Sequence, residues 1–314
     1  MLITGGAGFI GSHLAERCLE LGWRVLAVDA FTNYYDPARK QGNIQNVISH
    51  ENYEVIKGDL LEIELEPLLR QVSVVFHLAA QPGVRISWDR FDLYVRMNVS
   101  VTQRLLHAAR DLRLQKLVIA SSSSIYGDAE TLPTSEDATP LPVSPYGVTK
   151  VATEHLAQVY CRSFAVPTVC LRYFTVYGPR QRPDMGFHKL IDRALRGEAF
   201  EIYGDGEQTR DFTFVRDAVA ATVSAADSGA PGTAYNVGGG ARTSLNNVLD
   251  MVGGILGEPV ERVYREQQRG DARHTAADTT RARADLDFVP AHDLESGLRE
   301  QVEWQSSLIS ATRG

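Results

Sequence analysis

The sequence has few cysteines, no long hydrophobic run and no run of Lys or Arg. Its three cysteines, Cys18, Cys161 and Cys170, lie far apart, and none belongs to a C-x-x-C pair. This argues against a disulfide framework, a zinc site and a thiol redox centre. No apolar stretch approaches the roughly 18 residues of a membrane-spanning helix. The net charge of −7 is not interrupted by a basic stretch, so we expect neither a membrane nor a nucleic-acid partner.

The composition is that of an ordinary globular protein. Apolar residues make up 44% of the chain and charged residues 23%, which excludes disordered, collagenous and coiled-coil classes. The N-terminus shows no basic leader and no cleavage site, so we expect a cytoplasmic location. His13 and His77 lack a second histidine four residues away, and we expect structural roles and no metal.

Short β-branched runs alternate with amphipathic segments through the first half of the chain. This alternation predicts a parallel sheet covered by helices on both faces, a doubly wound α/β fold. The predicted strands are Met1–Thr4, Arg24–Val28, Tyr53–Lys57, Val72–His77, Lys116–Ala120 and Thr168–Arg172, and the predicted helices are Ile10–Leu21, Phe91–Leu112 and Pro145–Phe164.

The pattern changes after residue 175. A Pro- and Arg-rich loop, Tyr177–Asp184, leads to weaker elements: helices near Phe187–Leu195, Phe214–Ala226 and Leu245–Leu256, strands near Phe200–Tyr203 and Ala234–Val237, and turns at Gly204–Gly206 and Gly238–Gly240. With 314 residues the chain is long enough for two domains.

The strongest motif is the glycine-rich run from Thr4 to Gly11 (TGGAGFIG), which follows a strand and opens a helix. Gly5 permits a tight turn, Gly8 lets backbone approach a pyrophosphate, and Gly11 lets helix and strand pack closely. The free N–H groups at the start of the helix favour phosphate. Asp29 ends the second strand, where a carboxylate accepts ribose hydroxyls and repels a 2′-phosphate. The sequence therefore predicts NAD as the cofactor in preference to NADP.

Tyr146 and Lys150 lie four residues apart on one predicted helix, so their side chains share a face. A free tyrosine has a pKa near about 10, too high for a base at neutral pH. A nearby ammonium and the positive nicotinamide both favour the phenolate, which lowers that pKa toward a useful value. Pro145 in the first turn points this end of the helix to the carboxyl edge of the sheet, where ligands bind.

Taken together, the G-x-x-G-x-x-G spacing and the later Y-x-x-x-K pair resemble the short-chain dehydrogenase/reductase superfamily, in its extended, sugar-nucleotide-modifying branch. Asp59-Leu60, Leu78-Ala79-Ala80, Ser121–Gly127, Arg210–Asp217 and Tyr235–Gly238 resemble further marks of that family, so the likeness covers nearly the whole chain. It implies a Rossmann NAD-binding domain over residues 1–175, to which about 212–240 returns, and a smaller α/β domain over 176–314 that binds a UDP-sugar. It also implies a homodimer, with Phe91–Leu112 and Pro145–Phe164 as the pairing helices.

The resemblance assigns roles to single residues. It implies Tyr146, Lys150 and Ser122 as catalytic residues, with Ser122 and Tyr146 sharing the reacting hydroxyl. The implied cofactor contacts are Gly5, Gly8, Phe9, Ile10, Gly11, Asp29, Asn33, Asp59, Leu60, Leu78, Ala79, Ala80, Asn98, Ser121, Tyr146, Lys150 and Tyr173. The implied substrate contacts are Arg85, Ser122, Ser123, Ser124, Tyr146, Thr175, Arg182, Lys189, Tyr203, Arg210 and Asp271. Among these, Arg182 and Arg210 are expected at the pyrophosphate, Tyr203 on the uracil ring and Asp271 on the uridine ribose.

Ser123 and Ser124 bear on the reaction. The related 4,6-dehydratases have Asp-Glu at this place, and the UDP-xylose-forming decarboxylases tend to have Glu at the position of Ser124. Serine cannot supply the proton transfer that these reactions need. What remains is removal of hydride from C4 and its return to the other face, which is epimerisation.

Thr175 and Arg182–Met185 are similar to the UDP-glucuronate 4-epimerases, since most relatives have Asn in place of Thr175. Ser123, Ser124 and Thr175 are hydroxyl donors suited to a carboxylate. A UDP-glucose or UDP-N-acetylglucosamine 4-epimerase, a UDP-glucuronate decarboxylase and an idle NAD-binding regulator remain as alternatives. Gly204–Arg210 and residues 268–271 look more like the broader epimerase/decarboxylase pattern.

Overall fold

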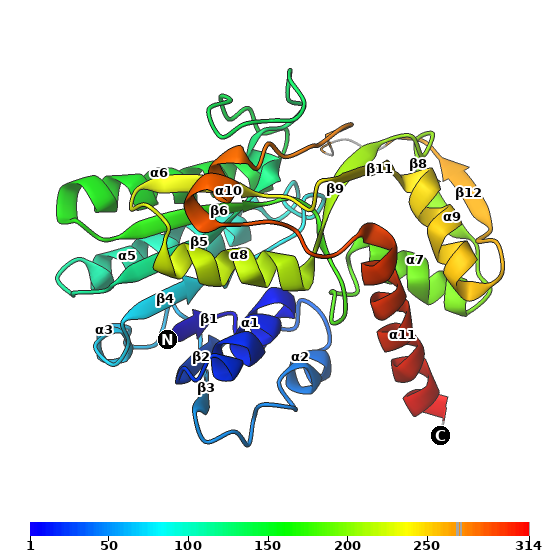
Figure 1. Ribbon diagram of the computed structural model, residues 1–314. Coiled ribbons are helices and arrows are strands. Elements are labelled where there is room, and N and C mark those ends of the chain that lie inside the picture. Colours follow the sequence, from blue (N-terminus) through cyan, green and yellow to red (C-terminus); the bar gives the residue numbers. More distant parts are fainter. Residues whose placement is uncertain (268–269, 271, 314) are drawn as a thin grey trace.

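The computed structural model describes residues 1–267, 270 and 272–313, and a seven-stranded sheet forms its centre. All neighbouring strands of this sheet run parallel, in the order β10-β6-β5-β4-β1-β2-β3 (Figure 1). Its strands are β1 (Leu2–Thr4), β2 (Val25–Asp29), β3 (Tyr53–Lys57), β4 (Val74–His77), β5 (Lys116–Ser122), β6 (Thr168–Tyr173) and β10 (Thr233–Val237). The predicted doubly wound α/β fold is confirmed. The strand order reverses between β1 and β4, and this is the place where such sheets bind ligands.

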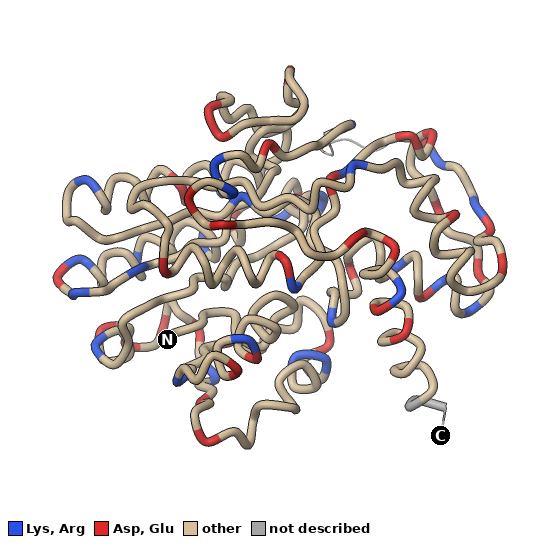
Figure 2. Tube along the Cα trace, viewed as in Figure 1, with Lys and Arg blue, Asp and Glu red and all other residues tan. Residues whose placement is uncertain are grey.

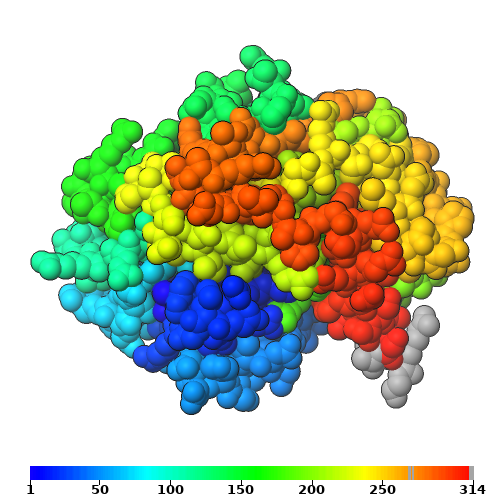
Figure 3. Space-filling model, viewed as in Figure 1, coloured from blue at the N-terminus to red at the C-terminus, as the bar shows by residue number. Residues whose placement is uncertain are grey.

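Helices cover both faces of the sheet because adjacent strand residues point to opposite sides. Ile3 and Val118 pack toward α1 (Phe9–Glu20) and α8 (Val215–Asp227), whereas Leu2 and Leu117 pack toward α5 (Val101–Ala109) and α6 (Pro145–Phe164). The N-terminal helix and α8 lie side by side on the face seen in Figure 3. Near-continuous apolar strands are typical of sheets buried on both sides.

The predicted helix Phe91–Leu112 is one helical path with an irregular centre. It consists of α4 (Phe91–Tyr94), a π-helical turn η1 (Val95–Ser100) and α5, and it ends at Ala109. The buried side chain of Asn98 lies in the π turn. Such turns are rare and concentrate at functional sites, and apolar periodicity alone does not predict them.

The remaining chain forms a smaller unit on the right of Figure 1. It contains the sheet β11-β9-β7 and the strand pair β12-β8, with bounds β7 (Val176–Tyr177), β8 (Phe200–Tyr203), β9 (Thr209–Phe214), β11 (Ala241–Ser244) and β12 (Arg262–Arg265). Its helices include α7 (Gly186–Leu195), α9 (Leu245–Leu256) and α11 (Leu294–Arg313), while α10 (Thr280–Leu286) packs beside β10 and α8.

Several of these elements are absent from the predicted list: β7, β9, β11, β12, α10, α11 and the short helices α2 (Pro37–Asn43) and α3 (Glu66–Leu69). Two of them, β9 and α2, carry a charged residue at a buried position, Asp211 and Lys40. Asp211 in β9 is 2% exposed and accepts hydrogen bonds from the N–H groups of Gly240 and Ala277. Partners that distant in the chain are not visible in a local apolar pattern.

Basic and acidic residues are scattered along the trace in Figure 2. In this view neither sign is confined to one part of the molecule. Among the described residues, no helix has both the length and the apolar character that crossing a membrane requires. Within the same part of the chain, no three His, Cys, Asp or Glu side chains are grouped so as to bind a metal ion.

Candidate active site

The glycine turn is built for close approach of a phosphate. Gly5 has a φ of +69°, and a Cβ there would lie 2.9 Å from the backbone nitrogen of Ala79. A Cβ on Gly11 would collide with the carbonyl oxygen of Gly5. Gly8 is the N-cap of α1, and no side chain caps that end, so its N–H groups face the carboxyl edge of the sheet.

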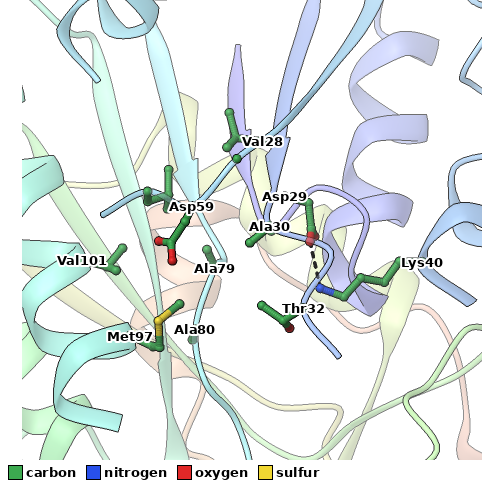
Figure 4. A pocket seen from close by; sticks show the side chains of 13 residues that line it. Val28, Asp29, Ala30, Thr32, Lys40, Asp59, Ala79, Ala80, Met97 and Val101 are labelled. Atoms are coloured by element: carbon green, nitrogen blue, oxygen red, sulfur yellow. Dashed lines mark hydrogen bonds and ion pairs between the residues drawn. The ribbon is translucent and has the colours of Figure 1, made fainter. Parts of the chain in front are cut away.

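A cavity opens beside this turn and contains the predicted ribose acceptor. Gly5, Asp29, Asp59, Leu60, Ala79 and Ala80 all line it, as six of the expected cofactor contacts (Figure 4). Asp29 is 4% exposed, and its two carboxylate oxygens accept hydrogen bonds from the N–H groups of Phe31 and Ala7. The carboxylate is therefore fixed at the end of β2, facing the cavity.

Sequence reasoning missed other residues of this cavity: Val28, Ala30, Thr32, Lys40, Gly58, Met97 and Val101. Lys40 is the most informative of them, since its Nζ lies 2.8 Å from Asp29 Oδ1. The expected contact Asn33 is exposed in the turn after β2 and does not line the cavity, whereas its neighbour Thr32 does.

Other expected cofactor residues have their side chains engaged elsewhere. The Asn98 amide accepts from Gln81 N–H and donates to Gln81 O and Thr149 Oγ1, which ties the loop after β4 to α6. The Tyr173 hydroxyl lies 2.7 Å from Thr222 Oγ1 in the core. Phe9 is 4% exposed and packs in the core below α1. The side chains of Asn98, Tyr173 and Phe9 thus bond or pack inside the protein and do not line the cavity.

Three further expected cofactor contacts, Leu78, Ile10 and Ser121, do not line the cavity. Leu78 N–H donates to Thr4 O. Ile10 lies in the first turn of α1 and is partly buried. The side chain of Ser121 donates to Glu154 Oε1, so its hydroxyl is engaged inside the protein.

The candidate base stands at the start of α6. Ser144 caps this helix by accepting the N–H of Gly147, and Pro145 occupies its first turn, as predicted. Tyr146 is partly exposed, so its hydroxyl can meet a substrate. Burial raises the pKa of Tyr146, while its hydrogen bond with Ser122 and the charge of Arg182 lower that pKa. The Tyr146 ring packs edge-on against the ring of Tyr94, at 6.2 Å between centroids.

Lys150 lies one turn further along α6, on the same side as Tyr146. Its Nζ lies 5.9 Å from the centroid of the Tyr146 ring and donates to Ala120 O at 2.8 Å. Burial lowers the pKa of Lys150 to about 8, although the negative charge of Glu154 raises it. The ammonium is therefore held between the base and the end of β5, without a direct hydrogen bond to the Tyr146 hydroxyl.

Three serines at the end of β5, Ser122, Ser123 and Ser124, lie close to the candidate base. Ser122 Oγ donates to Ser124 Oγ at 3.1 Å and accepts the Ser124 N–H, which starts the 3-10 turn η2 (Ser123–Ile125). Ser122 pairs with Tyr173 in the sheet register. Ser123, Ser124 and Thr175 consequently leave the same edge of the sheet from adjacent strands.

Glu154 lies one turn beyond Lys150 on the helix face that carries Tyr146. The spacing of four residues is visible in the sequence, but Glu154 is not among the predicted site residues. It pairs with Arg172 at 2.8 Å, and each side chain is 6% exposed. Arg172 also donates to the Tyr126 hydroxyl. This buried network joins α6 to β6 and to the residue after η2, and the Ser121 hydroxyl, which donates to Glu154, adds the end of β5.

The Arg182 side chain acts on the candidate base. Its charge acts on the pKa of Tyr146, and its guanidinium pairs with Asp184 at 3.0 Å. Asp184 also accepts the Tyr34 hydroxyl, which links this loop to the segment after β2. Arg210 lies on β9, and its guanidinium donates to the backbone oxygens of Thr209 and Arg273. The pyrophosphate contacts expected of Arg182 and Arg210 stay predictions.

Tyr203, the residue expected on the uracil ring, ends β8 in the smaller unit. The Arg85 guanidinium stacks 4.7 Å from the ring centroid of Tyr203, which brings two predicted substrate residues together. Lys189 is exposed on α7. Asp271 lies outside the described residues.

Two groups of residues lie along the carboxyl edge of the sheet. The glycine turn and Asp29 line the cavity. Tyr146, Ser122 and Lys150 gather at the ends of β5 and α6 and do not line it. The glycine turn has no room for a Cβ at Gly5 or Gly11, so a ligand can approach its backbone closely. This fits the pyrophosphate of a dinucleotide. Such a site suits reversible oxidation of an alcohol beside a nicotinamide ring.

Comparison with known proteins agrees with this geometry. The profile of the NAD dependent epimerase/dehydratase family matches residues 1–238. An uncharacterized UDP-glucose epimerase of Bacillus subtilis, YtcB, is 42% identical over 313 residues, covering 98% of each chain. A UDP-glucuronate 4-epimerase of Thermodesulfobacterium geofontis is 34% identical, over 98% of this chain and 96% of its own. The crystal structure of UDP-glucuronic acid 4-epimerase from Bacillus cereus, in complex with UDP-glucuronic acid and NAD, matches with a TM-score of 0.95 at 41% identity, over 98% of this chain and 99% of that chain.

Proposed function

Because this chain belongs to the NAD dependent epimerase/dehydratase family, we propose that it is an NAD-dependent isomerase that interconverts UDP-glucuronate and UDP-galacturonate at C4. The observation that carries the proposal is the set of hydroxyls beside Tyr146: Ser123 and Ser124 stand where a dehydratase has carboxylates, and Thr175 leaves the adjacent strand. The similarity to UDP-glucuronate 4-epimerases from two bacteria supports the uronate as substrate.

The cofactor site follows from the cavity beside the glycine turn. Gly5, Gly8 and Gly11 would cradle the pyrophosphate, and Asp29 would accept from the adenosine ribose. Lys150 is positioned to donate to the nicotinamide ribose. When bound, NAD⁺ takes up and returns the C4 hydride.

The chain's own groups handle the proton. Tyr146, as phenolate, removes the proton of the C4 hydroxyl while hydride leaves C4, and it returns that proton after hydride comes back to the other face. Ser122, hydrogen-bonded to Tyr146, donates to the same substrate oxygen and fixes its position. Lys150 and Arg182 lend positive charge to the phenolate.

The substrate carboxylate needs restraint because the 4-keto-uronate is a β-keto acid. It loses CO₂ when the C5–C6 bond aligns with the π system of the C4 carbonyl. We infer that Ser123, Ser124 and Thr175 donate hydrogen bonds to the carboxylate and hold that bond out of alignment. Arg182, at this end of the site, supplies a cation near the same group.

We further propose how the parts divide and assemble. Residues 1–175 with about 212–240 form the NAD-binding part, since β10 joins the main sheet, and most of 176–314 forms the UDP-sugar part. Exposed apolar side chains on α4 and α6, Phe91, Val148, Val159 and Phe164, support a homodimer through these helices. Three unpaired cysteines fit a reducing cytoplasm.

The test is a product assay with purified protein, NAD⁺ and four substrates: UDP-glucuronate, UDP-galacturonate, UDP-glucose and UDP-N-acetylglucosamine. We expect the two uronates to interconvert to one equilibrium mixture without net NADH, and the neutral sugars to remain unchanged. Conversion of UDP-glucose in preference to the uronate would make the protein a UDP-glucose 4-epimerase. Mainly pentose product would make it a decarboxylase, and no conversion would indicate a nucleotide-binding regulator.

A further inference from the structure

The ribose end of the cofactor cavity holds a buried ion pair. Lys40 Nζ lies 2.8 Å from Asp29 Oδ1, and the two side chains are 11% and 3% exposed. Figure 4 shows the lysine reaching across to the carboxylate, with both residues on the wall of the cavity. A cation thus stands beside the acid that is expected to exclude a 2′-phosphate.

Lys40 is held there from several sides. It lies on α2, which Asp36 caps by accepting the N–H of Ala38. Asn43 on the same helix donates to Ala7 O in the glycine turn at 3.1 Å. The Lys40 ammonium also lies 5.6 Å from the centroid of the Tyr35 ring. These contacts hold the Lys40 ammonium at the ribose end of the cavity. The side chain therefore does not have to move in from solvent to reach a ligand there.

The opposite charges of Lys40 and Asp29 give this pair a role in the choice between NAD and NADP. A 2′-phosphate at the ribose end of the cavity would meet Lys40 only in competition with Asp29, which already occupies its ammonium. A lysine next to a phosphate is a strong partner once it has no carboxylate of its own. Asp29 therefore opposes NADP in two ways, by repelling the phosphate and by neutralising Lys40.

We propose that Lys40 is a specificity-determining residue for the cofactor: Asp29 keeps its ammonium occupied, and without that carboxylate Lys40 becomes the contact for a 2′-phosphate. This rests on the proposed function only in that the cavity binds a nicotinamide dinucleotide. Simple repulsion by Asp29 predicts something different, namely that its removal admits NADP equally well whether Lys40 is present or not.

The experiment is a competition for binding. Full-length protein is equilibrated with equal concentrations of NAD⁺ and NADP⁺, freed of unbound nucleotide, and the bound nucleotides are quantified by mass spectrometry. The variants are Asp29→Ala, Lys40→Met, the double variant, and Asp29→Asn, which keeps an acceptor for Phe31 N–H. Arg39→Met is the matched control, because Arg39 neighbours Lys40 on α2, is exposed and does not line the cavity.

We expect Asp29→Ala to raise the bound NADP⁺-to-NAD⁺ ratio by about tenfold or more, the effect of gaining a hydrogen bond to a charged group. Adding Lys40→Met should remove most of that gain, and Arg39→Met should not. Asp29→Asn should show a smaller gain with the same dependence on Lys40, and it decides the matter if Asp29→Ala does not fold.

A gain that persists in the double variant would overturn the inference, and so would no gain in either Asp29 variant. In these two outcomes wild type still binds NAD⁺, so the proposed function stands. Wild type that binds neither nucleotide would overturn both.

Discussion

At the scale of single residues, the proposed chemistry depends on the Tyr146 hydroxyl in the first turn of α6. Tyr146 is hydrogen-bonded to Ser122 and has cations on two sides, Lys150 on its own helix and Arg182 from the loop after β7. Burial raises the pKa of Tyr146, whereas the hydrogen bond with Ser122 and the charge of Arg182 lower it. The net effect of these causes is a raised pKa. We expect a positive nicotinamide bound beside the ring to favour the phenolate.

Replacing Tyr146 with Phe removes that hydroxyl and little else. We expect turnover of UDP-glucuronate to fall by about 10²–10⁴-fold, the usual loss for a general base. NAD content and melting temperature should stay near wild type, since no residue lining the cofactor cavity changes. Tyr160→Phe on the same helix is the control and should keep its rate. More than about a third of the wild-type rate in Tyr146→Phe would contradict the assigned role.

Thr175 tests the restraint of the carboxylate. Thr175→Ala removes one donor, worth about 1.5–3 kcal/mol toward a charged acceptor. Hydride removal should continue because Tyr146, Lys150 and Ser122 remain. We expect slower epimerisation and leakage of a UDP-4-keto-pentose, formed as the C5–C6 bond breaks, CO₂ leaves and a proton adds at C5, with one NADH left per leaked molecule.

The readout for Thr175→Ala is mass spectrometry of the products together with absorbance near 340 nm. Slower epimerisation with no pentose at all would show that Thr175 does not restrain the carboxylate, and Ser123 and Ser124 would then be tested by the same substitution.

At the scale of elements, the position of α6 depends on a buried ion pair. Glu154 on α6 and Arg172 on β6 are each 6% exposed in the side chain and bond to one another through two nitrogens of the guanidinium. Because Glu154 continues the stripe of Tyr146 and Lys150, this pair fixes the helix face that carries the base.

Breaking the pair should be costly because one charge stays buried without a partner. We expect Glu154→Gln or Arg172→Met to lower the free energy of unfolding by about 3–5 kcal/mol, measured by urea titration. The double variant Glu154→Leu with Arg172→Met should lose less than the sum of the single losses. The exposed pair Arg17–Glu20 is the control, and Arg17→Met should cost at most about 1 kcal/mol. Equal losses in the two places would contradict a structural role for the buried pair.

At the scale of the whole molecule, the exposed apolar side chains of α6 bear on whether two chains assemble into a dimer. Val148, Val159 and Phe164 on α6 are 46%, 54% and 51% exposed, an unusual set of apolar side chains on one long helix. We expect light scattering at micromolar concentration to give twice the chain mass of 34.6 kDa. Val159→Glu should shift the particle to the single-chain mass while leaving its melting transition cooperative. A wild type of single-chain mass would contradict the dimer.

The sequence by itself determined the fold class, the nucleotide fingerprint and the Tyr146–Lys150 pair. These are local: the glycine spacing, a strand before it and a helix after it, and two side chains four residues apart all lie within a short stretch of chain. The family resemblance was visible for the same reason, and the family match confirms it.

Only the tertiary structure decided how distant residues combine. It paired Lys40 with Asp29, brought the charge of Arg182 close enough to act on Tyr146, tied the loop after β4 to α6 through the Asn98 amide, and buried Asp211 in a strand. Each of these depends on partners that the fold brings together from separate elements. The burial of a charge and the atom that compensates it are properties of that three-dimensional packing, and no local pattern of residues encodes them.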